Sequence, residues 1–162
     1  MLDLGRLRGY FRDKNWAAAH AALDEARNRA VCEDDLKNEA FWHVVTLTRE
    51  ERYEEALELL RQKAPLLGSQ SLVQRRIAAI LHKLGRDQDA LVELGKAPIE
   101  EEMQEFYGLA LDAKFLYFYL LAKSGDQSVR ERLSEIPDDY RHFTLDSEFL
   151  TKPDIVALLN RA

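Results

Sequence analysis

The sequence predicts an all-α protein, built from a series of antiparallel helical hairpins and closed at the C-terminal end by a capping helix. The 162 residues include only 7 Gly and 4 Pro, and this scarcity of helix breakers favours helices over a turn-rich β fold. Apolar residues recur at three- and four-residue steps, as at Ile77, Ile80, Leu81 and Leu84. Similar segments also recur every 34 to 39 residues, which is typical of stacked helical hairpins.

Four segments resemble one another, and each is expected to form the second helix of a hairpin. They begin at Lys14, Glu51, Gly85 and Gly125. Ala56 and Leu60 in the second segment precede Ala90 and Leu94 in the third by 34 residues each. The first helices are expected near residues 2–13, 36–49, 70–84 and 104–124. Ser69 is expected near the start of one of them, and Gly85 and Gly125 where a first helix turns into a second.

This spacing and the pattern of small residues resemble tetratricopeptide repeats. In the repeat that starts at Ser71, the family's small-residue positions hold Ala78, Gly85, Ala90 and Ala97. Gln74 departs from the family, which usually has Trp at that position. The resemblance covers about residues 1–137 and implies a right-handed α-solenoid of about four degenerate hairpins.

The remaining residues, 138–162, are interpreted as a C-terminal extension with the capping helix. The segment "FLTKPDIVALLNRA" predicts one short helix, with Thr151 as its N-cap and Pro153 and Asp154 in its first turn. A repeat array needs such a cap, because its last repeat has no neighbour to bury its apolar face. The array and the cap are expected to form one structural domain.

The most apolar stretch, "AKFLYFYLLAKSG" at residues 113–125, is interpreted as a helix buried on most sides. A membrane-spanning helix needs about 20 apolar residues, and this stretch is shorter. We expect it to be the densest part of the core, with Lys114 and Phe118 at its exposed edge.

Composition bounds the partners and the compartment. The net charge of −6 argues against a general nucleic-acid binder, which would carry a basic face. Cys32 is the single cysteine, so an intrachain disulfide is excluded and a reducing compartment is favoured. The first residues contain no apolar run of the kind found in a signal peptide. These observations predict a cytoplasmic protein with no membrane or nucleic-acid partner.

No pattern in the sequence indicates catalysis. The four histidines, His20, His43, His82 and His142, lack the spacing of metal ligands. Neither a glycine-rich phosphate loop nor a nucleophile elbow occurs. The acidic run at residues 100–102 is interpreted as a solvated helix face. The sequence therefore predicts a protein that is not an enzyme and that carries no metal or cofactor.

The tetratricopeptide resemblance implies that the first helices line a concave surface where a protein partner binds. Carried onto this sequence, it selects Phe41, Val45, Arg49, Arg75, His82, Lys83, Lys114 and Phe118 as candidate partner-binding residues. Their charges are basic, while acidic residues lie mainly in the second helices and turns. Such a groove would suit an acidic segment of a partner. Alternatively, these lysines and arginines extend over apolar surface without binding anything.

The function predicted from these observations is that of a non-catalytic protein-binding module. Its most specific form is a bacterial immunity protein or escort chaperone that masks a toxin or effector, because "LDSEFLTKPDIVALLNRA" is similar to the tails of small immunity proteins. The alternative is a scaffold or adaptor, including one that assembles with itself. A monomer and a homodimer are both compatible with the sequence.

Overall fold

The computed structural model describes residues 1–161 of the chain and confirms that the protein is helical. These residues form ten α-helices, one short 3-10 helix and a two-stranded antiparallel sheet. They group into two compact units, with unit 1 at Met1–Gly68 and unit 2 beginning at Ser69. The boundary at Gly68 was not predicted from the sequence.

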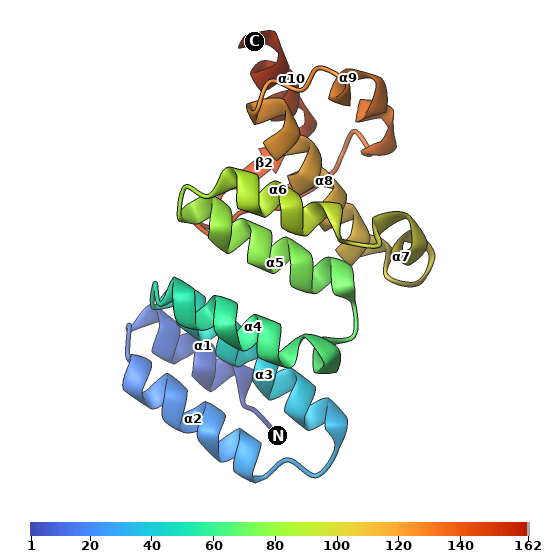
Figure 1. Cartoon of the computed structure of the whole chain (residues 1–162). Helices are drawn as coiled ribbons and strands as arrows, with labels where there is room; N and C mark the ends of the chain where they lie inside the picture. Colours follow the sequence, from blue (N-terminus) through green and yellow to red (C-terminus); the bar gives the residue numbers. More distant parts are fainter. Residues whose placement is uncertain (162) are drawn as a thin grey trace. The chain divides into compact units, whose positions relative to one another are not determined.

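Unit 1 consists of four helices arranged as two consecutive hairpins (Figure 1). They are α1 (Leu4–Arg12), α2 (Trp16–Asn28), α3 (Glu33–Arg49) and α4 (Tyr53–Leu67). Part of the core is a cluster in which Leu7, Ala19 and Leu23 are buried, with the partly buried Phe11 and Trp42 packed against it. The predicted first helices near 2–13 and 36–49 are therefore confirmed.

Unit 2 contains the other helices and the sheet. Its helices are α5 (Gln70–Lys83), α6 (Asp87–Gly95), α7 (Ile99–Glu105), α8 (Tyr107–Lys123), α9 (Val129–Arg132), the 3-10 helix η1 (Leu133–Glu135) and α10 (Lys152–Arg161). Strand β1 (Arg141–Phe143) pairs with β2 (Phe149–Thr151), and His142 lies opposite Leu150. Figure 1 shows α9 and α10 at the end of α8 that is far from α7.

The turn after the first helix of each hairpin has the same geometry in all four places. In each, one residue has a positive φ: Lys14 (52°), Glu51 (64°), Gly85 (76°) and Gly125 (91°). The next residue donates its N–H to a carbonyl five residues earlier, as in Arg86 to Leu81 at 2.8 Å and Asp126 to Leu121 at 3.0 Å. This is the Schellman ending of an α-helix. The four repeated segments thus begin with the same turn. The fourth segment was also expected to form a second helix, and this prediction is wrong in part, because it forms only the four-residue helix α9 and the 3-10 helix η1.

Helix α8 is the centre of unit 2. The buried residues of its core cluster include Leu111, Phe115 and Phe118 from α8, and Ile155 and Leu159 from α10. Helices α5, α6, α7, α9 and α10 and strand β1 all contact α8. The interpretation of residues 113–125 as densely packed core is therefore confirmed.

The predicted C-terminal helix is present as α10. The carboxylate of Asp154 accepts hydrogen bonds from the N–H and the hydroxyl of Thr151, at 2.6 and 3.0 Å, just before the helix begins. Ile155 and Leu159 are buried against α8. The short sheet that precedes α10 was not predicted, because two three-residue strands leave little alternation to detect in the sequence.

The acidic run at residues 100–102 was expected to be a solvated helix face, but it is not solvated throughout. It lies in α7, which was also not predicted. The Glu102 carboxylate accepts hydrogen bonds from Ser69 Oγ and from the N–H groups of Gln70 and Ser71, at 2.8 to 2.9 Å. Ser69 Oγ in turn accepts from the Leu72 N–H at 3.1 Å, so its predicted place at the helix start is confirmed. A glutamate distant in sequence thus satisfies the free N–H groups of α5.

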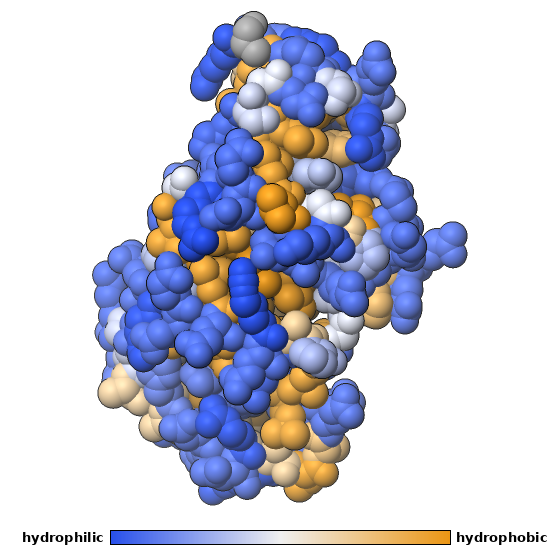
Figure 2. Space-filling model, viewed as in Figure 1, coloured by the Kyte–Doolittle hydropathy of each residue, from blue (hydrophilic) through white to orange (hydrophobic). Residues whose placement is uncertain are grey.

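The surface is mostly hydrophilic in the view of Figure 2, with apolar side chains visible between the helices. A few large apolar side chains are exposed. In unit 2 they include Val92 (59%), Tyr107 (52%), Phe143 (50%) and Phe149 (56%).

The repeated turn predicts opposite effects of glycine at equivalent positions. Glu51→Gly should stabilise the protein by about 0.5–1 kcal/mol, because glycine adopts positive φ without the clash that a side chain makes. Gly85→Ala should destabilise it by about 1 kcal/mol for the same reason, although nothing lies within 4 Å of the added Cβ. Urea unfolding would measure both.

Gly9→Ala is the matched control, since Gly9 lies inside α1 with an ordinary φ and open space beside it. There alanine should stabilise the helix by up to about 1 kcal/mol. Equal effects at Gly9 and Gly85 would contradict the assignment of backbone strain to the turn.

Candidate functional site

Lys114 was expected at the exposed edge of its helix, and this prediction is wrong. The residue is buried, with 4% of its surface exposed. Its Nζ lies 3.0 Å from Glu100 Oε1 and 3.0 Å from Glu135 Oε2. Glu100 comes from α7, which the repeat pattern did not predict, and Glu135 comes from the segment that follows α8. The charge of Lys114 is therefore neutralised within unit 2 and is not available to a partner.

Phe118 is likewise buried, with 1% of its surface exposed, so its expected place in an open groove is wrong. The guanidinium of Arg132 lies 4.7 Å from the centre of the Phe118 ring. Arg132 also pairs with Glu135 at 2.9 Å. The segment after α8 folds back over this face of the helix and covers it.

Two of the candidate residues on α5 line a hollow that the β1–β2 hairpin borders. His82 and Lys83 line it from α5, Tyr119 from α8, and His142 and Asp146 from the hairpin, and its volume is about 260 Å³. Lys83 Nζ bonds both carboxylate oxygens of Asp146 at 2.8 and 2.9 Å, so the hairpin tip is fastened to α5. His82 Nδ1 lies 2.6 Å from Asp87 Oδ1.

A partly buried chain of polar groups ends at His142, which lines this hollow. The Tyr140 hydroxyl donates to Asp112, and Tyr140 also lies 3.1 Å from His142 Nδ1. The His142 ring stacks on Phe115, with ring centres 4.9 Å apart and planes 17° apart. Burial and the nearby positive charge of Arg75 lower the pKa of His142 from 6.5 to about 4, so the ring is neutral near pH 7.

Arg75, another of the candidate residues, contributes charge to this chain without a hydrogen bond. It interacts electrostatically with Asp112, Tyr140 and His142. Its Nε is buried and has no hydrogen-bond partner among the residues described. Arg75 therefore acts on the electrostatics of the chain rather than as an open binding residue.

Unit 1 holds a different arrangement, in which arginines surround exposed aromatic edges. Arg8, Phe11 and Arg12 of α1 line a hollow of about 410 Å³ together with Trp42 and Arg49 of α3. The Arg49 guanidinium lies 5.7 Å from the centre of the Phe11 ring, and the Phe11 and Trp42 ring centres are 6.5 Å apart. We call these five residues the arginine–aromatic patch.

The other two candidate residues of unit 1 lie beside this patch on α3. Phe41 is half-buried and packs edge-on against Trp42, with ring centres 5.5 Å apart. Val45 is also half-buried. Of the eight candidate residues, Arg49 is the one that combines exposure with membership of the patch.

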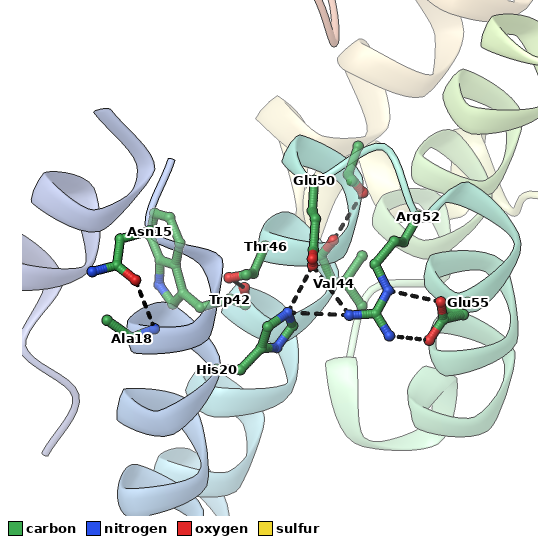
Figure 3. A network of polar contacts seen from close by, with 10 residues as sticks. Asn15, Ala18, His20, Trp42, Val44, Thr46, Glu50, Arg52 and Glu55 are labelled. Carbon is green, nitrogen blue, oxygen red and sulfur yellow. Dashed lines mark hydrogen bonds and ion pairs between the residues drawn. The ribbon is translucent and has the colours of Figure 1, made fainter. Parts of the chain in front are cut away.

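A second polar region of unit 1 is satisfied internally (Figure 3). His20 Nε2 lies 2.8 Å from Glu50 Oε2, and Arg52 bonds both Glu50, at 3.2 Å, and Glu55, at 2.7 Å. These contacts join α2 to the turn between α3 and α4. The charged side chains of this network are paired with one another, so the network stabilises the hairpin junction.

The sequence pattern did not predict a functional role for Arg8, Phe11, Trp42 or the Asp112–Tyr140–His142 chain. One signal for the patch was present in "LGRLRGYFR", which contains three arginines and no acidic residue. The Asp112–Tyr140–His142 chain had no comparable signal in the sequence, because Asp112 lies about 30 residues before the other two. Only the folding of the C-terminal extension onto α8 brings them together.

Among residues 1–161, no group of three or more His, Cys, Asp or Glu side chains could hold a metal ion. In the same residues, every helix is too short or too polar to cross a membrane.

No protein-family model, curated protein or solved structure matches this chain. The resemblance to tetratricopeptide repeats therefore depends on the repeated residues and the repeated hairpin turns.

The burial of Lys114 predicts unequal effects of removing the two sides of its ion pairs. The double change Glu100→Gln and Glu135→Gln should cost about 3 kcal/mol, because it leaves a buried ammonium without a counter-charge. Lys114→Met should cost less, about 1 kcal/mol, because the carboxylates that remain are 67% and 34% exposed and can be hydrated.

Lys96→Met is the control, because Lys96 is 60% exposed and 3.8 Å from Glu93, and its loss should cost under about 0.5 kcal/mol. Chemical denaturation would compare the variants. A double glutamine variant as stable as the wild type would contradict the buried pair.

The neutral state of His142 predicts that stability falls on acidification. Folding lowers the pKa of His142 from 6.5 to about 4. Its contribution to the free energy of unfolding is therefore complete above pH 6.5 and is lost as the pH falls to about 4. The loss should be up to about 3 kcal/mol. His142→Phe, which can keep the stacking on Phe115, should show a smaller decrease between pH 6.5 and 4, measured by urea unfolding. If the wild type and His142→Phe lose stability equally between pH 6.5 and 4, the prediction is contradicted.

Proposed function

We propose that the chain is a non-catalytic protein-binding module, and that its arginine–aromatic patch binds an acidic, partly apolar segment of a partner protein. The observation that carries this proposal is the lack of internal partners at the patch. Neither Arg8 nor Arg49 forms an ion pair or a hydrogen bond through its side chain within residues 1–161. Both side chains are exposed.

The charge balance makes this lack of partners notable. The chain has 29 acidic and 23 basic side chains, and many of its basic groups are paired with acidic ones. Arg12 of the patch pairs only with its neighbour Asp13, at 3.2 Å, and both side chains are largely exposed. Such a pair contributes little to stability. The patch therefore concentrates positive charge that a partner's carboxylates can neutralise through charge-assisted hydrogen bonds.

The aromatic rings give the patch an apolar part as well. Trp42 and Phe11 are half-buried, which holds their rings in place while leaving an edge for contact. Tryptophan and arginine are also the residue types that contribute most to protein interfaces. A partner segment that alternates carboxylates with an aromatic or aliphatic side chain would match both features.

The most specific form of this proposal is an immunity protein or escort chaperone that masks a toxin or effector. It is supported by the similarity of residues 145–162 to the tails of small immunity proteins. We also propose that the hairpins form a right-handed, tetratricopeptide-like array, and the four equivalent Schellman turns support this arrangement.

A second candidate function, self-assembly as a scaffold, is favoured by the outer face of the β1–β2 hairpin. Phe143 and Phe149 lie opposite each other with ring centres 4.9 Å apart, and both are at least half exposed. A two-stranded sheet also leaves strand edges with unpaired backbone groups. The proposed partner in this case is a second copy of the chain. Light scattering should then show a dimer in the wild type and a monomer in Phe143→Ser/Phe149→Ser.

A direct test of the patch uses a fluorescein-labelled peptide in which Asp alternates with Leu and Trp. The double variant Arg8→Glu/Arg49→Glu should bind it at least tenfold more weakly than the wild type, since each lost charge-assisted hydrogen bond costs roughly 1.5–3 kcal/mol. Fluorescence anisotropy would measure the dissociation constants. The same variants, coexpressed with the product of the neighbouring gene, would test the masking role by copurification.

Arg29→Glu is the matched control, because Arg29 lies on the C-terminal end of α2, is 72% exposed and is outside the patch. It should change the affinity less than about twofold. If Arg29→Glu weakens binding as much as the double variant does, the peptide responds to net charge alone and the patch is not a site.

A further inference from the structure

The hollow between α5, α8 and the β1–β2 hairpin has the size of a small-molecule site. Its volume of about 260 Å³ exceeds the roughly 150 Å³ of a cavity that holds benzene. Its lining includes Ala79, Leu116 and Leu150, which supply apolar surface from three separate segments. The ion pair of Lys83 with Asp146 holds the third of these segments in place.

His142 presents one unused hydrogen-bond acceptor to this hollow. Tyr140 has a single hydroxyl proton, which it donates to Asp112. The 3.1 Å contact between Tyr140 and His142 must therefore be a hydrogen bond from His142 Nδ1–H to the Tyr140 oxygen. Burial and the Asp112 carboxylate raise the pKa of Tyr140, which keeps the phenol protonated and this arrangement intact.

With the proton on Nδ1, His142 Nε2 carries a lone pair. Only 3% of the residue's surface is exposed, it lines the hollow, and Nε2 has no hydrogen-bond partner among residues 1–161. The ring cannot turn to seek another partner, because it stacks on Phe115 and is held by Tyr140. A hydrogen-bond acceptor whose ring is fixed in this way favours a ligand that donates an N–H or O–H group.

The charged groups around the hollow favour a neutral ligand. Lys83 is neutralised by Asp146, and His82 is bonded to Asp87. Glu148, whose side chain is exposed, is the remaining charged residue of the lining, and the rest is apolar or carries hydroxyl groups, from Tyr119 and Thr144. An anionic ligand would therefore lose its hydration without gaining an unpaired counter-charge, and a cationic one would find only the exposed, hydrated carboxylate of Glu148.

We propose that this hollow binds a small, neutral aromatic molecule, of the size of indole, whose N–H or O–H group donates a hydrogen bond to His142 Nε2. The Asp112–Tyr140–His142 chain sets the tautomer that makes this bond. The site is separate from the arginine–aromatic patch, since all its lining residues belong to unit 2 and the patch belongs to unit 1.

The experiment compares indole with benzofuran, which has the same shape but an oxygen in place of the N–H. Both are titrated into the full-length, ¹⁵N-labelled protein and followed by NMR. Indole should bind with a dissociation constant of about 0.1 mM, as expected for nine non-hydrogen atoms, and should shift the amide signals of Leu116, Tyr119 and Leu150. Benzofuran should bind at least tenfold more weakly.

Two variants separate the hydrogen bond from the shape of the hollow. His142→Phe keeps an aromatic ring beside Phe115 but has no acceptor, and should lose the preference for indole. Tyr119→Phe, which alters the same hollow without touching His142, should keep it. Equal binding of indole and benzofuran by the wild type would overturn the proposal, as would the absence of binding by either. This comparison needs no variant, so it decides the question even if His142→Phe does not fold.

Discussion

The structure of unit 2 depends on one constraint, the burial of helix α8. Its side chains are apolar on nearly every face, so most of them must be shielded from water, and Phe115 is completely buried. An open array would leave one face of the last repeat uncovered. The segments after α8 therefore fold back over it, and α10 and β1 both contact it.

The covering also decides where charge can act. Lys114 is buried between two carboxylates, and Lys83 is ion-paired with Asp146 at the hairpin tip, so these two cations of unit 2 stabilise the fold. Unit 1 has no segment of its own that covers α1 and α3 in this way. Arg8 and Arg49 are therefore exposed. The binding surface that we propose is therefore in unit 1. In unit 2 the segments that cover α8 border a hollow of about 260 Å³, which suits a much smaller ligand.

Some errors of prediction have a clear physical origin. The family pattern placed Lys114 and Phe118 on an open face because it treats every repeat as having the same neighbours. In this chain the neighbours are Glu100, Glu135 and Arg132, none of which lies on a first helix. The prediction for residues 100–102 was wrong for a related reason. Glu102 caps helix α5 instead of being solvated, because the fold brings it beside the start of that helix, about 30 residues earlier in the chain.

The sequence by itself determined the helical class, the positions of the hairpin turns, the buried character of residues 113–125 and the C-terminal helix. These features follow from local causes: the periodicity of apolar residues, the conformational freedom of Gly85 and Gly125, and the residues around Thr151 that begin α10. Only the tertiary structure decided which basic residues are exposed and that Asp112, Tyr140 and His142 form a chain. Those outcomes depend on contacts between residues far apart in sequence, and no local pattern encodes such contacts.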